Sequence, residues 1–371
     1  MSVFLKVRDR LIENKKRKLL GEDLSIPFVN FPKLSTVIPG IQKGRYIIVT
    51  GGPKSAKSQI TSNLFITNTL DFLHQKPNTN IKVKIFVFSL EMSKEYQIEQ
   101  IISNRIFLDT KKIISPENLN SYFNTPLDDD VAIDLHTEAY TKWFEFLEKH
   151  VTYIDNIRTP EGIYGYMFEY AKRNGKFFYK GKEVDTSVHN FMWDEYVEND
   201  KDLYTIVITD HVGLLESTSN HTDLRLSIEY FSKRVCIPLR DKFQFTIVNV
   251  QQQALGAEMQ EFNKNGEVII EKVKPKHTGL GDSKTTARDC DIIYSIFNPS
   301  LYEIPTYPVK NGYNITIMRN HYRELSILLN RRGQNGISLD LFFHGAVSYF
   351  KELPPPEKMT AEVYRKLGLI K

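Results

Sequence analysis

The residues best suited to hold phosphate lie in the segment IIVTGGPKSAKSQ, residues 47–59. An apolar run there leads into a small-residue loop and then into a helical pattern, which is the setting of the motif GxxxxGK[ST]. In such a loop, backbone N–H groups surround the phosphates, a lysine reaches their oxygens and a hydroxyl holds Mg²⁺. The segment predicts a nucleotide-binding loop, with a plain strand-to-helix turn as the alternative. Its residues are Gly51, Gly52, Pro53, Lys54, Ser55, Ala56, Lys57 and Ser58.

One position departs from the motif, because Ala56 replaces its second glycine. Alanine keeps the side chain small but resists a positive φ angle. We therefore expect the loop to hold phosphate less well than the glycine form.

Two carboxylates follow apolar runs of strand length. Glu91 comes just after residues 83–89, and Asp210 ends the run YTIVITD. A glutamate at the carboxyl end of a strand beside the phosphate loop is well placed to activate water. Asp210 is placed to hold Mg²⁺ opposite Ser58. The alternatives are an incidental charge beside a helix-capping Ser93, and Glu216 as a weaker rival base.

Apolar runs alternate with helical patterns along most of the chain, and their continuity indicates a mostly parallel α/β sheet covered on both faces. The predicted strands are Tyr46–Thr50, Val83–Ser89, Tyr204–Thr209, Phe245–Val250, Ile292–Phe297 and Leu325–Leu329. The predicted helices are residues 4–20, Ser58–Leu73, Lys94–Phe107, Pro160–Arg173 and Thr222–Lys242. Residues 175–202 break the alternation with turn signals and predict an inserted hairpin.

Composition narrows the class of protein further. Of 371 residues, 41% are hydrophobic and 25% charged, as in globular proteins. We expect no membrane span and no secretory signal peptide, and two cysteines exclude a disulfide framework or a zinc site. These features predict a cytoplasmic protein. The net charge of +4 is concentrated in residues 1–20, so charge alone neither requires nor excludes DNA binding.

The segment FVFSLEMSKE, residues 86–95, resembles the second motif of DnaB-type replicative helicases, whose motor is RecA-like. The resemblance implies that Glu91 is the general base of ATP hydrolysis. Residues 204–217 resemble the Walker B strand of that family, with His211 in a slot that usually holds an aromatic residue. We expect His211 to have a packing or hydrogen-bonding role.

Two later segments resemble further motifs of the family. The segment that ends in three glutamines implies a sensor of the γ-phosphate at Gln252, with Gln251 and Gln253 as neighbours and a solvating loop as the alternative. Residues 324–350 imply an arginine finger at Arg331, with Arg332 as the alternative. Leu329 stands where the family often carries a lysine.

The glycine-containing segment 254–283 corresponds to a loop that faces the central channel in RecA-like rings. The resemblance makes three of its lysines candidates for contact with single-stranded DNA, although a solvated hairpin is nearly as good an interpretation. These residues are Lys272, Lys274 and Lys276.

The resemblance covers about residues 25–350 and predicts a RecA-like P-loop NTPase core. Residues 1–24 are expected to form a basic, amphipathic linker helix and residues 351–371 a tail. This implies an ATP- and Mg²⁺-dependent replicative helicase, a homohexameric ring on single-stranded DNA, with a primase or helicase loader as further partners. The family's N-terminal domain is missing from the sequence, which suggests a reduced, phage-like form in the cytoplasm of a bacterium or an infected host.

The motifs leave two alternative functions open, because ring and filament proteins share one motor fold. One is a RecA-like recombination or single-strand-binding filament that does not unwind DNA. The other is a degenerate scaffold subunit with weak hydrolysis, which the residues Ala56 and Leu329 favour.

Overall fold

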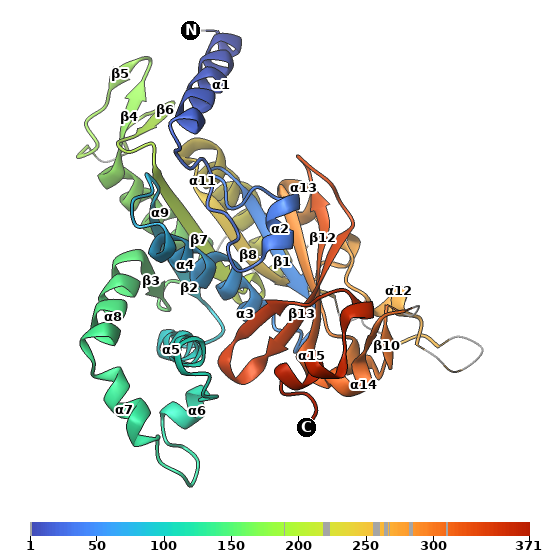
Figure 1. Cartoon of the computed structure of the whole chain (residues 1–371). Coiled ribbons are helices and arrows are strands. Elements are labelled where there is room, and N and C mark those ends of the chain that lie inside the picture. The colour runs from blue at the N-terminus through green and yellow to red at the C-terminus, as the bar shows by residue number, and fades with distance from the viewer. Residues whose placement is uncertain are drawn as a thin grey trace.

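The computed structural model describes residues 2–188, 190–217, 223–254, 260–262, 266, 268–281, 285–308 and 311–371. Its centre is a nine-stranded sheet in the order β14-β13-β12-β9-β1-β8-β7-β2-β3 (Figure 1). These strands are β1 (Tyr46–Gly51), β2 (Lys82–Ser89), β3 (Val151–Ile154), β7 (Leu203–Asp210), β8 (Thr246–Gln252), β9 (Ile292–Phe297), β12 (Tyr322–Asn330), β13 (Ile337–His344) and β14 (Tyr349–Glu352). The six strands from β9 to β3 are parallel, and β12 to β14 continue the sheet antiparallel.

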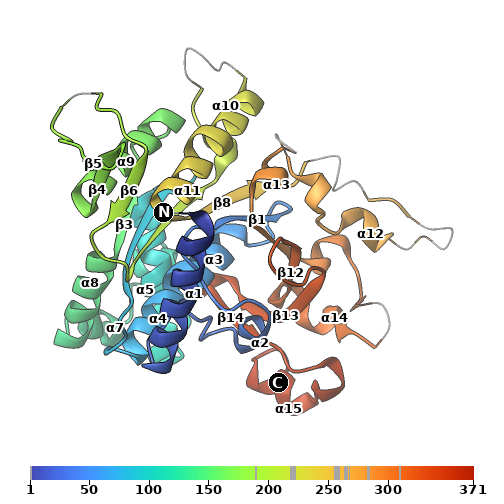
Figure 2. The ribbon, with the colours of Figure 1, turned by 90° about the horizontal axis from the view of Figure 1, so that it is seen from above.

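Figure 2 shows β1 between β3, which forms one edge of the sheet, and β12, which lies toward the other edge. All six predicted strands are present in this sheet as β1, β2, β7, β8, β9 and β12. The prediction of an α/β, mostly parallel fold is confirmed.

Helices cover both faces of the sheet, because successive residues of the buried strands point to opposite sides. Along β1, Ile47 and Val49 join one hydrophobic cluster, whereas Tyr46 and Ile48 join the other. The first cluster includes residues of α3 (Lys57–Ser62), η1 (Asn63–Thr67), α4 (Asn68–Gln75), α5 (Lys94–Thr110) and α8 (Glu138–His150). The second includes residues of α9 (Pro160–Asn174), α10 (Leu224–Tyr230), η3 (Phe231–Cys236) and α11 (Ile237–Phe243).

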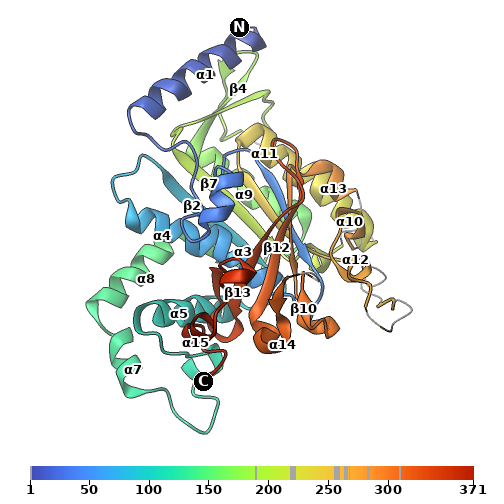
Figure 3. The ribbon, with the colours of Figure 1, turned by 45° about the vertical axis from the view of Figure 1, so that its right-hand side comes forward.

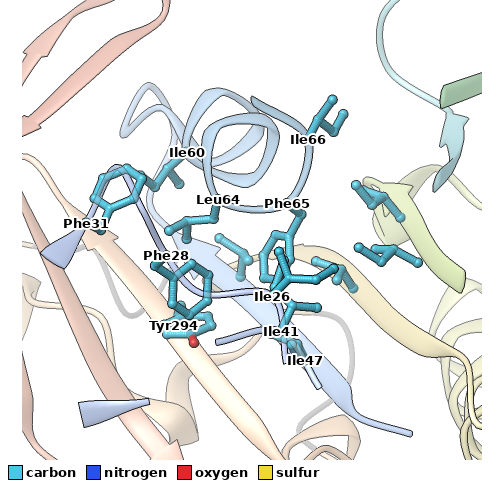
Figure 4. Packing of buried hydrophobic residues seen from close by; sticks show 14 of the residues in the cluster. Ile26, Phe28, Phe31, Ile41, Ile47, Ile60, Leu64, Phe65, Ile66 and Tyr294 are labelled. Atoms are coloured by element: carbon cyan, nitrogen blue, oxygen red, sulfur yellow. The ribbon is translucent and has the colours of Figure 1, made fainter. Parts of the chain in front are cut away.

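The approach to β1 is an extended segment that packs under the helix following the phosphate loop. Ile26 and Ile41 form an antiparallel bridge, and α2 (Pro32–Val37) lies between them in sequence. Phe28 and Phe31 are buried beside Leu64 of η1 (Figure 4). This packing fixes the helix whose first turn carries the site residues.

Helix α1 (Val3–Leu19) projects from this body and has no buried residue (Figures 1 and 3). Its Phe4 is 87% exposed and Leu11 is 60% exposed. Ion pairs connect its other side to residues near the inserted hairpin: Lys6 with Glu195 at 3.5 Å and Glu13 with Lys201 at 3.3 Å. The insertion is a three-stranded antiparallel sheet of β4 (Gly175–Tyr179), β5 (Lys182–Glu183) and β6 (Glu195–Glu198).

The packed body continues beyond residue 350, where the sequence suggested a tail. β14 crosses that position, and Leu353 and Tyr364 are buried in a cluster with residues of the small β10–β11 sheet. The remaining elements are α6 (Pro116–Leu119), α7 (Asp129–Leu135), α12 (Ile270–Val273), α13 (Thr286–Asp289), β10 (Thr306–Tyr307), β11 (Tyr313–Asn314), α14 (Ile315–Met318), α15 (Ala361–Lys366) and short 3-10 turns. Within the described residues, no helix is long and apolar enough to cross a bilayer.

Candidate active site

The predicted phosphate loop joins the end of β1 to the start of α3. Ala56 adopts a left-handed conformation, with φ 77° and ψ 37°, although it carries a Cβ. A Cβ at Gly51 would lie 2.5 Å from the carbonyl oxygen of Ile296, so this position requires glycine. The Lys57 ammonium is buried and donates to the Gly52 carbonyl at 2.8 Å. The residue at the second glycine position of the motif therefore has a left-handed backbone conformation even though it is alanine.

Ser58 and Asp210 come from distant parts of the chain and meet at the carboxyl edge of the sheet. The Ser58 hydroxyl donates to Asp210 Oδ1 at 3.0 Å. Burial is the main reason that the pKa of Asp210 is raised to about 6, and the nearby Glu91 carboxylate raises it further. The Ser58 hydrogen bond and the Lys57 charge oppose this shift.

Glu91 lies directly after β2, beside the end of β7. Ser89 and Asp210 are neighbours across these two strands, and the Leu90 and Glu91 N–H groups donate to the Asp210 carbonyl at 2.7 and 3.3 Å. The Glu91 side chain is 48% exposed and its Oε2 lies 3.8 Å from His211 Nε2. Gly213 N–H donates to His211 Nδ1 at 3.1 Å, so in neutral His211 the Nε2 proton faces Glu91.

The rival carboxylate Glu216 is engaged elsewhere. It pairs with Arg158 at 3.2 Å, and Arg158 also donates to the Leu90 carbonyl at 2.6 Å. Arg158 is not evident as a site neighbour from the sequence, because the strand that ends shortly before it, β3, has only four residues. The signal available in the sequence is a basic residue, Arg158, placed a few positions after the end of a short strand.

The three glutamines at the end of β8 have different surroundings. Gln251 donates to the Gly281 carbonyl at 2.7 Å, and Gln253 donates to the Thr50 hydroxyl at 3.0 Å. Both side chains are buried, whereas Gln252 is half-buried and its Cα is paired with that of Gly51. Among the described residues, the Gln252 amide has no hydrogen-bond partner. Gln252 is therefore the glutamine whose amide is available beside the phosphate loop.

The three candidate DNA-contacting lysines also differ. Lys274 forms an ion pair of 2.8 Å with the buried Glu324, which places its charge inside the domain. Lys272 pairs with the exposed Glu261 at 3.2 Å. In the described contacts Lys276 is engaged through its backbone: its N–H donates to Gln253 Oε1 at 3.4 Å, and its carbonyl accepts from the Gly279 N–H at 3.0 Å. The geometry therefore argues against a DNA contact for Lys274. Other parts of segment 254–283 lie outside the described residues.

The candidate arginine finger lies at the opposite edge of the sheet. Asn330 at the end of β12 is paired with Ile292, which in turn is paired with Ile47 near the start of β1. The Arg331 N–H donates to the Asp291 carbonyl at 3.0 Å, and its guanidinium donates to the Arg288 carbonyl. Arg331 and Arg332 are both exposed. Arg331 is thus separated from the phosphate loop of its own chain by the length of the sheet.

No protein-family model matches the sequence, and a search of curated proteins finds no match either. Among solved structures, the ATPase domain of G40P aligns with a TM-score of 0.60 at 15% identity, over 93% of this chain and 98% of that chain. A DnaB-like replicative helicase, solved in a study of its interactions with primase, aligns with a TM-score of 0.57 at 15% identity, over 93% and 66%. The chain has the fold of a DnaB-type helicase motor domain. The RecA-like fold inferred from the resemblance is confirmed, and the site described above lies at the carboxyl edge of its sheet.

Proposed function

We propose that the chain is an ATP-driven DNA helicase motor that acts as a ring of identical subunits around one DNA strand. The observation that carries this proposal is the convergence of Lys57, Ser58, Asp210 and Glu91 at the carboxyl edge of the sheet, with Ser58 and Asp210 3.0 Å apart. The fold shared with DnaB-type ATPase domains supports the same function.

The residues at this edge fit Mg²⁺ and ATP. Ser58 and Asp210 offer a hydroxyl and a buried carboxylate, which are oxygen ligands of the kind that Mg²⁺ prefers. The described residues contain no cluster of three or more His, Cys, Asp or Glu side chains that could hold a metal alone. Phosphate oxygens and water would therefore complete the coordination shell. Bound there, Mg²⁺ would neutralise charge on the β- and γ-phosphates.

The remaining site residues have separate roles in this proposal. Lys57 would exchange its bond to the Gly52 carbonyl for a phosphate oxygen. Glu91 would orient the attacking water and accept its proton, with His211 Nε2 lying 3.8 Å from one oxygen of the carboxylate. The unengaged amide of Gln252 would bond the γ-phosphate while it is present and release it after hydrolysis.

Assembly is needed to complete the site, because Arg331 cannot reach the phosphates of its own chain. We propose that it enters the site of a neighbouring subunit. The exposed apolar residues of α1 would dock on an adjacent subunit, and Lys272 and Lys276 would contact DNA in the channel. A primase or a helicase loader is the further partner we propose, since one structural neighbour was solved in a study of its interactions with primase.

The test measures ATP hydrolysis with and without single-stranded DNA, together with strand separation of a forked duplex. We expect DNA-stimulated hydrolysis and unwinding, both lost in Lys57→Ala. Hydrolysis without unwinding would favour a filament protein, and little hydrolysis in the intact chain would favour a scaffold subunit. Electron microscopy with a non-hydrolysable ATP analogue and DNA distinguishes closed rings from helical filaments.

A further inference from the structure

A buried arginine behind the phosphate loop has no role in the proposed chemistry. Arg323, near the start of β12, is 1% exposed. Its Nε donates to the Ser55 carbonyl at 3.0 Å, although 268 residues separate the two in sequence. Among the described residues, no carboxylate lies within ion-pair distance of this guanidinium.

The guanidinium is held on all sides by the protein. Its Nη1 donates to the Asn320 and Tyr322 carbonyls at 2.9 and 2.7 Å, and its Nη2 donates to Asn320 Oδ1 at 2.9 Å. The ring of Phe343 lies 4.4 Å below it. Burial lowers the pKa of Arg323 to about 9, so the group stays charged at neutral pH. This set of contacts fixes the position of Nε and therefore of the carbonyl that it binds.

The carbonyl of Ser55 belongs to the peptide unit that joins Ser55 to Ala56. The orientation of that peptide relative to the Ala56 Cα is the φ angle of Ala56, which is 77°. Left-handed backbone is unfavourable for a residue with a Cβ, so this conformation needs support from its surroundings. In a trans peptide the C=O and N–H point in opposite directions. Anchoring the carbonyl on the buried arginine therefore turns the Ala56 N–H away from the core.

We propose that Arg323 is a positioning residue that holds the Ser55–Ala56 peptide in the phosphate-binding form and so compensates for the missing second glycine. Within the described part of the chain, the Ala56 N–H has no acceptor, which leaves it for a phosphate oxygen. The ligand is the anionic phosphate chain of a nucleotide, so this inference rests on the proposed function for its ligand. The support of the Ala56 conformation does not depend on any ligand.

The experiment is a double-mutant cycle between Arg323→Met and Ala56→Gly, read by two measurements on the full chain. One is the dissociation constant of a fluorescent ATP analogue with Mg²⁺. The other is the equilibrium of urea unfolding without nucleotide. We expect Arg323→Met to weaken nucleotide binding about tenfold or more when residue 56 is alanine, and about threefold or less when it is glycine. The unfolding equilibrium should show the same direction of coupling.

A matched control is Arg45→Met. Arg45 is also buried, donates to Gln42 at 2.9 Å, and lies at the other end of β1. It should destabilise the fold without any dependence on residue 56. If Arg323→Met is too unstable alone, recovery of folded protein by Ala56→Gly but not in the Arg45 series supports the proposal. Arg323→Lys, which keeps the charge but lacks the fork of donors, provides a milder variant with the same expected coupling.

Equal effects of Arg323→Met or Arg323→Lys in the alanine and glycine backgrounds would overturn the proposal. Arg323 would then be an ordinary core residue. If the chain binds no nucleotide at all, the proposed function fails, but the unfolding cycle still tests the support of Ala56.

Discussion

The two edges of the central sheet differ in how far the chain satisfies its own charged groups. At the carboxyl edge, Lys57, Asp210 and Arg323 are buried and each has hydrogen-bond partners in the same chain. At the amino edge, Arg331 and Arg332 are exposed, and Arg331 contacts only carbonyl oxygens in its described hydrogen bonds. The charged groups at the carboxyl edge are thus satisfied within the chain, whereas the amino edge presents exposed guanidinium groups for which the described residues show no ion pair.

Asp291, whose backbone carbonyl binds the Arg331 N–H, has a carboxylate that is already engaged. Asp291 is 7% exposed, accepts from the Tyr46 N–H at 2.9 Å, and lies 3.4 Å from Arg240. Since its carboxylate is committed to the start of β1, it does not neutralise Arg331. This difference supports the proposal that one chain is enough to bind nucleotide, whereas the charge for hydrolysis would be supplied to the site of another chain.

The largest expected effect belongs to the amino edge. Arg331→Ala should reduce ATP turnover roughly 10³-fold or more, because a finger stabilises charge on the transferring phosphoryl group. Nucleotide affinity should stay nearly unchanged, since the phosphate loop is intact. Steady-state hydrolysis with DNA and equilibrium binding separate the two quantities. If Arg332→Ala causes this loss instead, the finger moves by one residue.

Mixing Arg331→Ala with Lys57→Ala tests whether the finger acts between subunits. A mixed ring contains some interfaces at which an intact phosphate loop meets an intact Arg331. Two inactive proteins should therefore recover part of the DNA-stimulated hydrolysis. Labelled subunits show independently whether exchange occurs. Background activity despite exchange would contradict a site that each neighbouring pair completes by itself.

The second effect belongs to the carboxyl edge. Glu91→Gln should keep nucleotide binding and lower turnover on the order of 10²-fold or more, which is the usual contribution of a positioned base. Glu216→Gln is the matched control, because Glu216 is paired with Arg158 and should change turnover little. A reversed pattern in steady-state assays would assign the base to Glu216.

The parts predicted from the sequence share a local signal. Six strands were found because each is a continuous apolar run, and the site residues Ser58, Glu91 and Asp210 each follow such a run. β3 was missed because four residues give too little pattern, and α8 was missed although Tyr140 and Leu147 form its buried side. Short elements at the rim of a sheet carry weak periodicity.

The parts that could not be predicted depend on distant contacts. Nothing local to Arg323 indicates that it binds the Ser55 carbonyl 268 residues away. Similarly, three lysines that alternate along the sequence looked equivalent, but a buried Glu324 engages Lys274 and leaves Lys276 outside that contact. The sequence shows which residue types are present and in what order. Tertiary packing decides which of their side chains remain available to bind another molecule.

The next prediction concerns the cost in folding free energy of burying the Asp210 carboxylate at the carboxyl edge. The pKa of Asp210 is raised from 3.8 to about 6, so the folded protein binds this proton more tightly than the unfolded chain. The contribution of the Asp210 carboxyl to the free energy of unfolding is therefore fully present below pH 3.8. It is lost as the pH rises toward and through about 6. In metal-free protein, Asp210→Asn should raise the free energy of unfolding at pH 8 by up to about 3 kcal/mol, and by less at pH 5. Urea unfolding with a chelator measures this, and an equal effect at both pH values would contradict it.

The smallest effect tests which lysines face DNA. Lys276→Ala should weaken single-strand binding a few-fold and reduce the slope of log K against log salt by roughly 0.7, the contribution of one phosphate contact on a single strand. Lys274→Ala should instead destabilise the fold, because it leaves the buried Glu324 carboxylate without its partner at 2.8 Å, while the salt slope stays unchanged. Fluorescence anisotropy with a labelled oligonucleotide over a salt series gives the slope, and urea unfolding gives the stability. A reduced slope in Lys274→Ala with normal stability would mean that this ion pair opens to DNA. The carboxyl edge would then resemble the amino edge, because one of its charged side chains would bind another molecule instead of a partner in the same chain.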